Sequence, residues 1–114
     1  MRENKFVFYS KYKSIRSKCH LGHYHPSKLE ALHCMRLLSD KQNGYILDFK
    51  CHIKFELRVK DKLITNHYVD FLINNKDGSL VVNETKGKEM PDWIIKRRLF
   101  EVCYPEIPYI VIKK

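Results

Sequence analysis

The chain has 114 residues, 44% of them hydrophobic, and its 22 Lys and Arg residues against 13 Asp and Glu residues give a formal net charge of +9. This length favours a single domain with a modest core, and no apolar run approaches the length of a membrane-spanning helix, so we expect a cytoplasmic protein with no membrane partner. A basic excess of this size favours a polyanionic partner, with nucleic acid preferred over a lipid surface.

Residues 1–25 have no regular hydrophobic period, and basic side chains are interleaved there with Phe and Tyr. The segment is either a solvated arm or an arm that contacts phosphates and packs its rings on bases. We expect it to precede a core domain over residues 26–114. If the arm binds nucleic acid, its phosphate contacts would come from Lys11, Lys13, Arg16 and Lys18.

A cluster of potential metal ligands lies near the end of this arm and consists of Cys19, His20, His23 and His25. Zinc sites usually combine two closely spaced ligand pairs at a defined distance. The cluster lacks that spacing, so a polar loop or a phosphate contact is favoured over zinc.

The first predicted helix covers about residues 28–42. Ser27, followed three residues later by Glu30, fits a capping box at the start of this helix. Apolar residues then recur at near-helical spacing. Asn43 and Gly44 supply a stop, because glycine readily adopts the left-handed conformation that ends many helices.

Three strands are predicted to follow this helix. Residues 45–59 include the alternating apolar and charged pattern of a half-buried strand. A second strand over residues 64–73 follows a turn at Asp61-Lys62, and a third strand over residues 79–86 follows a turn that ends at Gly78.

A second helix is predicted from Met90-Pro91-Asp92, because proline is well tolerated in the first turn of a helix. It ends at Tyr104-Pro105, and a closing strand covers residues 107–112. The expected order is therefore helix, three strands, helix, strand.

The turn before the third strand predicts which residues face each other. A three-residue hairpin loop favours glycine in its last position, and Gly78 supplies it. Counting back from that loop places Asp70 opposite Glu84, with their β-carbons about 5 Å apart on one face. Lys86 lies two residues after Glu84 and should share its face. A register slip of one residue would separate these side chains.

Two opposed carboxylates repel each other unless a proton, a lysine or a metal ion offsets their charge. Magnesium prefers hard oxygen ligands, and Asp70, Glu84 and the backbone carbonyl of Thr85 would supply them. Lys86 would orient or deprotonate an attacking water, or stabilise developing charge on a phosphodiester. The alternative is an ordinary surface hairpin with a Glu–Lys pair.

Several segments resemble the PD-(D/E)XK nuclease superfamily. Tyr68-Val69-Asp70-Phe71 and Leu80-Val81-Val82-Asn83-Glu84-Thr85-Lys86-Gly87 are similar to its core motif, with Val69 in place of the proline of the superfamily name. Residues 26–31 resemble its upstream helix, and residues 96–105 resemble its following helix. The resemblance covers residues 26–112 and points to small phage endodeoxyribonucleases of the junction-resolving endonuclease I type.

The resemblance implies an α/β fold with a restriction-endonuclease-like core, in which helices flank a central mixed β-sheet. It implies a Mg²⁺-dependent endodeoxyribonuclease, also able to use Mn²⁺, with Asp70 and Glu84 as metal ligands and Lys86 as the catalytic lysine. Glu30 would be an accessory catalytic acid, a use that conflicts with the capping box. The resemblance also implies a homodimer that acts on DNA, including branched DNA, in the cytoplasm of a bacterial host.

Other positions near the motif receive looser expectations. His52 would take the place of a glutamine that related phage sequences often carry, and no role is assigned to it. Trp93 and Phe100 are expected in the core rather than stacked on bases. Three further basic residues are expected to contact phosphates, namely Lys88, Lys96 and Arg97.

Two other functions fit the same composition. A non-catalytic basic nucleic-acid-binding module would explain the charge without any chemistry, and its binding would be strongly salt-sensitive. A virus-coded accessory protein would instead bind a protein partner through the aromatic arm. None of these hypotheses requires a small-molecule cofactor.

Overall fold

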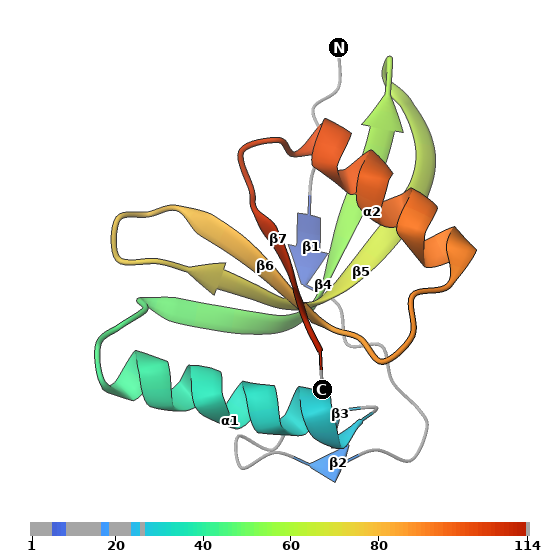
Figure 1. Ribbon diagram of the computed structural model, residues 1–114. Coiled ribbons are helices and arrows are strands. Elements are labelled where there is room, and N and C mark those ends of the chain that lie inside the picture. The colour runs from blue at the N-terminus through green and yellow to red at the C-terminus, as the bar shows by residue number, and fades with distance from the viewer. Residues whose placement is uncertain (1–5, 9–16, 19–23, 26, 114) are drawn as a thin grey trace.

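The computed structural model describes residues 6–8, 17–18, 24–25 and 27–113 (Figure 1). Its elements in chain order are β1 (Phe6–Phe8), β2 (Ser17–Lys18), β3 (Tyr24–His25), α1 (Lys28–Gln42), β4 (Asp48–Val59), β5 (Lys62–Asn74), β6 (Leu80–Thr85), α2 (Pro91–Cys103) and β7 (Tyr109–Ile112). From α1 onward the order is helix, three strands, helix, strand. The predicted α/β fold is therefore confirmed.

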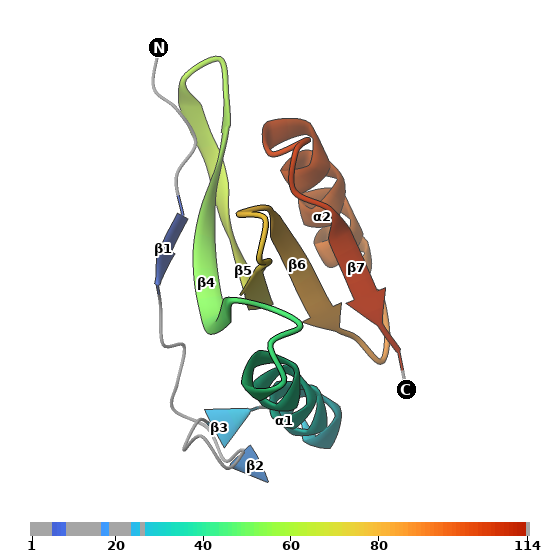
Figure 2. The same ribbon diagram turned by 90° about the vertical axis from the view of Figure 1, so that its left-hand side faces the viewer.

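A five-stranded mixed sheet forms the centre of the molecule, with strand order β1-β4-β5-β6-β7. Neighbouring strands are antiparallel except β6 and β7, which run parallel and are joined through α2. In Figure 2 the strands lie side by side, with α1 below one end of the long β4–β5 hairpin and α2 beside its upper half. Within the described residues, no helix is both long and apolar enough to cross a bilayer.

The two helices begin and end as predicted, whereas strand boundaries differ. The β4 strand begins at Asp48 rather than at Tyr45, and its connection to β5 is a turn at Lys60–Asp61, one residue before the predicted position. Both turn residues have positive φ, 49° and 70°, as the favoured two-residue hairpin turn requires. In addition, β1 pairs with β4, so part of the predicted arm belongs to the sheet.

Other predictions for the arm lie largely outside the described residues. Lys11, Lys13 and Arg16 fall there, as do Cys19, His20 and His23 of the predicted ligand cluster. Lys18 lies in β2 and His25 in β3, where the backbone is described but the side chains are not.

Two apolar clusters share the β4–β5 hairpin. The α1 cluster contains Ala31, Cys34, Leu37, Phe49, Cys51, Phe71 and Ile73. The α2 cluster contains Ile53, Phe55, Leu57, Val69, Leu72, Val82, Trp93, Phe100, Tyr104, Ile107 and Tyr109. The expected core positions of Trp93 and Phe100 are thus confirmed.

Along the β4–β5 hairpin, two consecutive residue pairs of the ladder belong to different clusters. Cys51 pairs with Phe71 in the α1 cluster, and Ile53 pairs with Val69 in the α2 cluster. His52 lies between these two pairs, and its φ of 58° lies in the left-handed region.

Seven polar side chains are buried in the described residues, and we call six of them, all but His67, the polar layer. They come from α1, β4, β5 and β6, and comprise Glu30, His33, His52, Asp70, Asn83 and Glu84. Because buried polar groups are costly unless they are hydrogen-bonded, their mutual contacts decide how α1 sits on the sheet.

Candidate active site

The predicted β5–β6 register is confirmed. The ladder pairs Phe71 with Asn83, and the Asn75 N–H donates to the Ser79 carbonyl at 2.9 Å. Gly78 has a φ of 88°, the left-handed conformation that the loop demands at this position. One further step of the same register places Asp70 opposite Glu84.

The two carboxylates are held by hydrogen bonds that link the strands. Glu84 Oε1 accepts from the Asp70 backbone N–H at 2.9 Å, and Asp70 Oδ2 accepts from the N–H and the hydroxyl of Thr85 at 2.9 and 2.8 Å. Glu84 Oε2 accepts from the Trp93 indole N–H at 3.1 Å. These hydrogen bonds fix the orientation of both carboxylates on adjacent strands.

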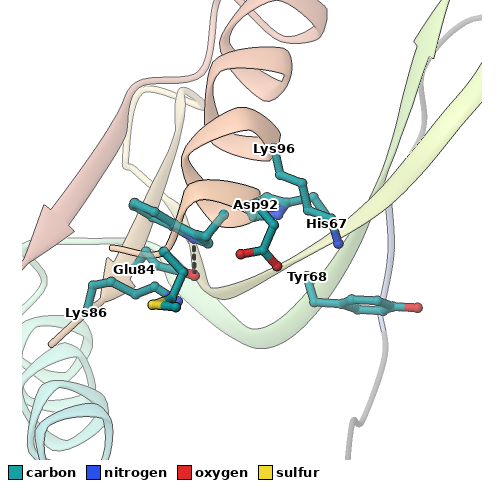
Figure 3. Close-up of a pocket in the computed structure, with 8 residues that line it drawn as sticks. His67, Tyr68, Glu84, Lys86, Asp92 and Lys96 are labelled. Carbon is teal, nitrogen blue, oxygen red and sulfur yellow. Dashed lines mark hydrogen bonds between the residues drawn. The ribbon is translucent and has the colours of Figure 1, made fainter. Parts of the chain in front are cut away.

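Glu84 and Lys86 reach the same pocket, in agreement with their predicted common face. The pocket has a volume of about 320 Å³ and is lined by His67, Tyr68, Glu84, Lys86, Met90, Asp92, Trp93 and Lys96. Figure 3 shows Glu84 and Lys86 at one end of it and Lys96 at the other. The Lys86 ammonium lies 4.9 Å from the centroid of the Trp93 ring, an arrangement that favours a cation.

Glu30 is turned toward the interior. Its backbone N–H donates to Ser27 Oγ at 3.1 Å, which confirms the predicted cap from Ser27. Its carboxylate oxygen Oε2, however, lies 2.8 Å from His52 Nε2, and only 2% of Glu30 is exposed. The backbone of Glu30 thus serves the cap from Ser27 while its Oε2 meets β4, and the catalytic role of Glu30 stays a prediction.

A second polar contact joins α1 to the sheet through His33. The Asn83 side-chain amide donates to His33 Nε2 at 2.9 Å. Burial lowers the pKa of His33, and the nearby Arg36 charge lowers it further. A neutral imidazole then offers the lone pair that the amide needs. Sequence reasoning assigned no role to either residue, although Glu30 and His33 have the i, i+3 spacing that places two side chains on one helix face.

The buried Tyr109 on β7 lies close enough to the two acids to sense their charge. Tyr109 is buried, and its hydroxyl lies 2.8 Å from His67 Nε2. Burial raises the pKa of Tyr109, and the negative charges of Glu84 and Asp70 add to this effect. The pKa of a residue on β7 thus responds to both carboxylates.

The predicted phosphate contacts on the C-terminal half differ in placement. Lys88 is exposed and Lys96 lines the pocket. The Arg97 guanidinium packs over the rings of Trp93 and Tyr109, with its carbon 5.9 and 5.3 Å from their centroids. Its Nε is buried and has no hydrogen-bond partner within the part of the chain that the structure describes. Lys88 and Lys96 are therefore better placed than Arg97 to meet a phosphate.

Comparison with known proteins assigns a family. Residues 7–114 match the family model DUF1064, described as a protein of unknown function. The chain belongs to the DUF1064 family. Searches of curated proteins and of solved structures found no match.

The oxygen donors of this DUF1064 protein fit a hard cation better than a soft one. Among the described residues, no group of three or more His, Cys, Asp and Glu side chains is arranged to hold a metal ion. Magnesium commonly takes one or two protein carboxylates and keeps several waters. Asp70 and Glu84 supply two such carboxylates, of which Glu84 lines the pocket.

Proposed function

We propose that this protein is a Mg²⁺-dependent endodeoxyribonuclease that hydrolyses phosphodiester bonds. The observation that supports it best is the pair of buried carboxylates, Asp70 and Glu84, on adjacent strands, with Glu84 and Lys86 facing one pocket. The net charge of +9 adds a preference for a polyanionic substrate.

Each residue has a definite task in this proposal. Asp70 and Glu84 would hold Mg²⁺, which supplies a more acidic bound water and neutralises charge on the phosphate. Thr85 and Trp93 keep the two carboxylates in fixed orientations, so little reorganisation is needed when the substrate arrives. Lys86 presents its ammonium to the same pocket, where it can orient a water or stabilise the charge that develops on the phosphate.

The first prediction concerns these residues directly. Asp70→Asn and Lys86→Met should each reduce cleavage by about 100-fold or more, because each removes a charge needed at the reacting phosphate. The measurement is cleavage of a labelled four-way junction, a matched linear duplex and a single strand, with Mg²⁺ or with chelator. Ranking the three substrates also shows whether branched DNA is preferred.

Asp61→Asn is the matched control, because it makes the same acid-to-amide change at the β4–β5 turn, where asparagine tolerates a positive φ. Thermal melting of each variant separates a lost site from a lost fold. Wild-type protein that binds DNA but does not cut it with Mg²⁺ would replace this proposal with the non-catalytic binding module.

A further inference from the structure

We propose that His52 is a positioning residue that holds the Glu30 carboxylate beside Asp70. The inference rests on the proposed function and extends it, because it adds to the site a helix acid and the strand residue that orients it. Three structural features support the assignment, namely a short buried contact, the position of His52 in the sheet and its backbone conformation.

The first feature is the contact between the two side chains. His52 Nε2 and Glu30 Oε2 are 2.8 Å apart, and the two residues are 5% and 2% exposed. A carboxylate at this depth needs a donor, since an unpaired buried charge is strongly unfavourable. The imidazole supplies such a donor from β4 and thereby helps to fix where the carboxylate of α1 points.

The second feature is the position of His52 in the sheet. The β4–β5 ladder pairs Cys51 with Phe71 and Ile53 with Val69, and His52 and Asp70 are the residues between these pairs. Asp70 is opposite Glu84 when the β5–β6 register is continued by one step. His52 therefore lies on the β4 side of Asp70, as Glu84 lies on its β6 side. The residue that holds Glu30 is thus a direct neighbour of the strand position that carries the central acid.

The third feature is the backbone of His52. Its φ of 58° is uncommon for a residue other than glycine. Lys60 and Asp61 also have positive φ, but they form a two-residue hairpin turn that requires it. His52 lies inside the twelve-residue strand β4, where no turn requires it. Strained conformations persist where the surroundings hold them, often at functional sites.

The competing explanation is that His52 only docks α1 onto the sheet. The chain contains its own comparison for this, because His33 makes a similar buried contact from α1 to Asn83 on β6. Losing either contact should loosen α1. Only loss of the His52 contact should release the Glu30 carboxylate.

The test compares two substitutions of His52. His52→Gln retains an amide donor with nearly the reach of Nε2, whereas His52→Asn retains the donor and tolerates the left-handed backbone but is too short to reach Glu30. We expect His52→Asn to lower kcat for cleavage by about tenfold or more, with KM for DNA changed less than about twofold. His52→Gln should recover most of the activity. His33→Leu should lower the melting temperature without a comparable loss of kcat.

A double-mutant cycle tests whether His52 acts through Glu30. In the Glu30→Gln background, His52→Asn should cause little further loss of kcat, because the group that it positions is already altered. The ¹⁵N shifts of the His52 ring in NMR spectra should also change in Glu30→Gln, and this readout does not depend on activity.

Different outcomes identify which proposal fails. If the wild type cleaves no DNA with Mg²⁺, the proposed function and this inference fail together. If the wild type cleaves and folded His52→Asn keeps its kcat, only the positioning role is overturned. Equal losses from His52→Asn in the wild-type and Glu30→Gln backgrounds would overturn it as well.

Discussion

Individual hydrogen bonds fix the positions of the two central acids, Asp70 and Glu84. Asp70 and Glu84 are tied to each other through the Asp70 N–H, and each also accepts from a residue beyond that pair. Trp93 has two functions here, because its ring belongs to the α2 cluster while its indole N–H meets Glu84. The core and the site are therefore not separate sets of residues.

The lowered pKa of His33 predicts how stability changes with pH. His33 is harder to protonate in the folded state than in the unfolded state, where the ordinary value is 6.5. Below that pH the unfolded chain binds more protons, so folding stability should fall as the pH decreases from 6.5 toward the lowered folded pKa. Denaturant unfolding across this range would measure the effect.

His33→Gln supplies the comparison, since its carbonyl oxygen can accept from Asn83 but its side chain does not titrate. As the solution is made more acidic, the wild type should lose more folding stability than His33→Gln. A difference that is independent of pH would show that His33 is not the titrating group.

The sequence predicted contacts correctly between residues that are separated by only a short stretch of chain. Asp70 and Glu84 could be brought together because one glycine at position 78 specified the loop and hence the register. The contact of Glu30 with His52 could not be found in this way. It depends on how α1 docks and on a left-handed residue inside a strand, and neither leaves a local pattern.

Helix α1 carries two residues of the polar layer, so its N-terminus is important for the site as well as for stability. Ser27 caps the helix by accepting from the Glu30 N–H at 3.1 Å, and the buried His33 lies three residues after Glu30. A helix that frays at this end would release the Glu30 carboxylate from β4.

We therefore predict that Ser27→Ala lowers the free energy of unfolding by about 1 kcal/mol, which is typical for loss of an N-cap. Ser39→Ala on the same helix is a matched control, because Ser39 is exposed and its Oγ accepts at 3.4 Å from the exposed Asn43 side chain. Urea unfolding of both variants measures the difference. Equal stability of the two variants would contradict the importance of the cap.

The bounds of helices were predicted correctly where nearby residues mark the helix start or end. The cap at Ser27 and the proline at position 91 mark the helix starts, and both helices agree with the prediction. The β4–β5 turn was misplaced by one residue because Lys60 and Asp61 adopt positive φ without a glycine. In that hairpin, pairing of the long strands overrides the local preference of the turn.

At the scale of the whole molecule, the charge of +9 predicts how DNA binding responds to salt. Binding to a duplex by Asp70→Asn, measured by fluorescence anisotropy, should weaken by about tenfold or more between 50 and 200 mM salt. The same experiment with Asp61→Asn controls for the added charge. Affinity that does not change with salt would contradict a phosphate-dominated interface.

In the folded molecule, part of the predicted N-terminal arm joins the sheet of the predicted core domain. Strand β1 pairs with β4 across a wide separation in sequence, and residues 6–8 carry no signal for that pairing. Long-range strand pairing depends on the edge that the rest of the sheet leaves open, here the outer side of β4. Only the assembled sheet defines that edge.

The shared β4–β5 hairpin has a consequence for how this chain folds. Both apolar clusters contain residues from β4 and β5, so neither can assemble before these strands are in register. The turns on either side of β5 are short, and contacts that close short loops form first. Asp70 and Glu84 should therefore meet early, while still hydrated. We expect them to lose water later, when α2 docks and the Trp93 indole reaches Glu84.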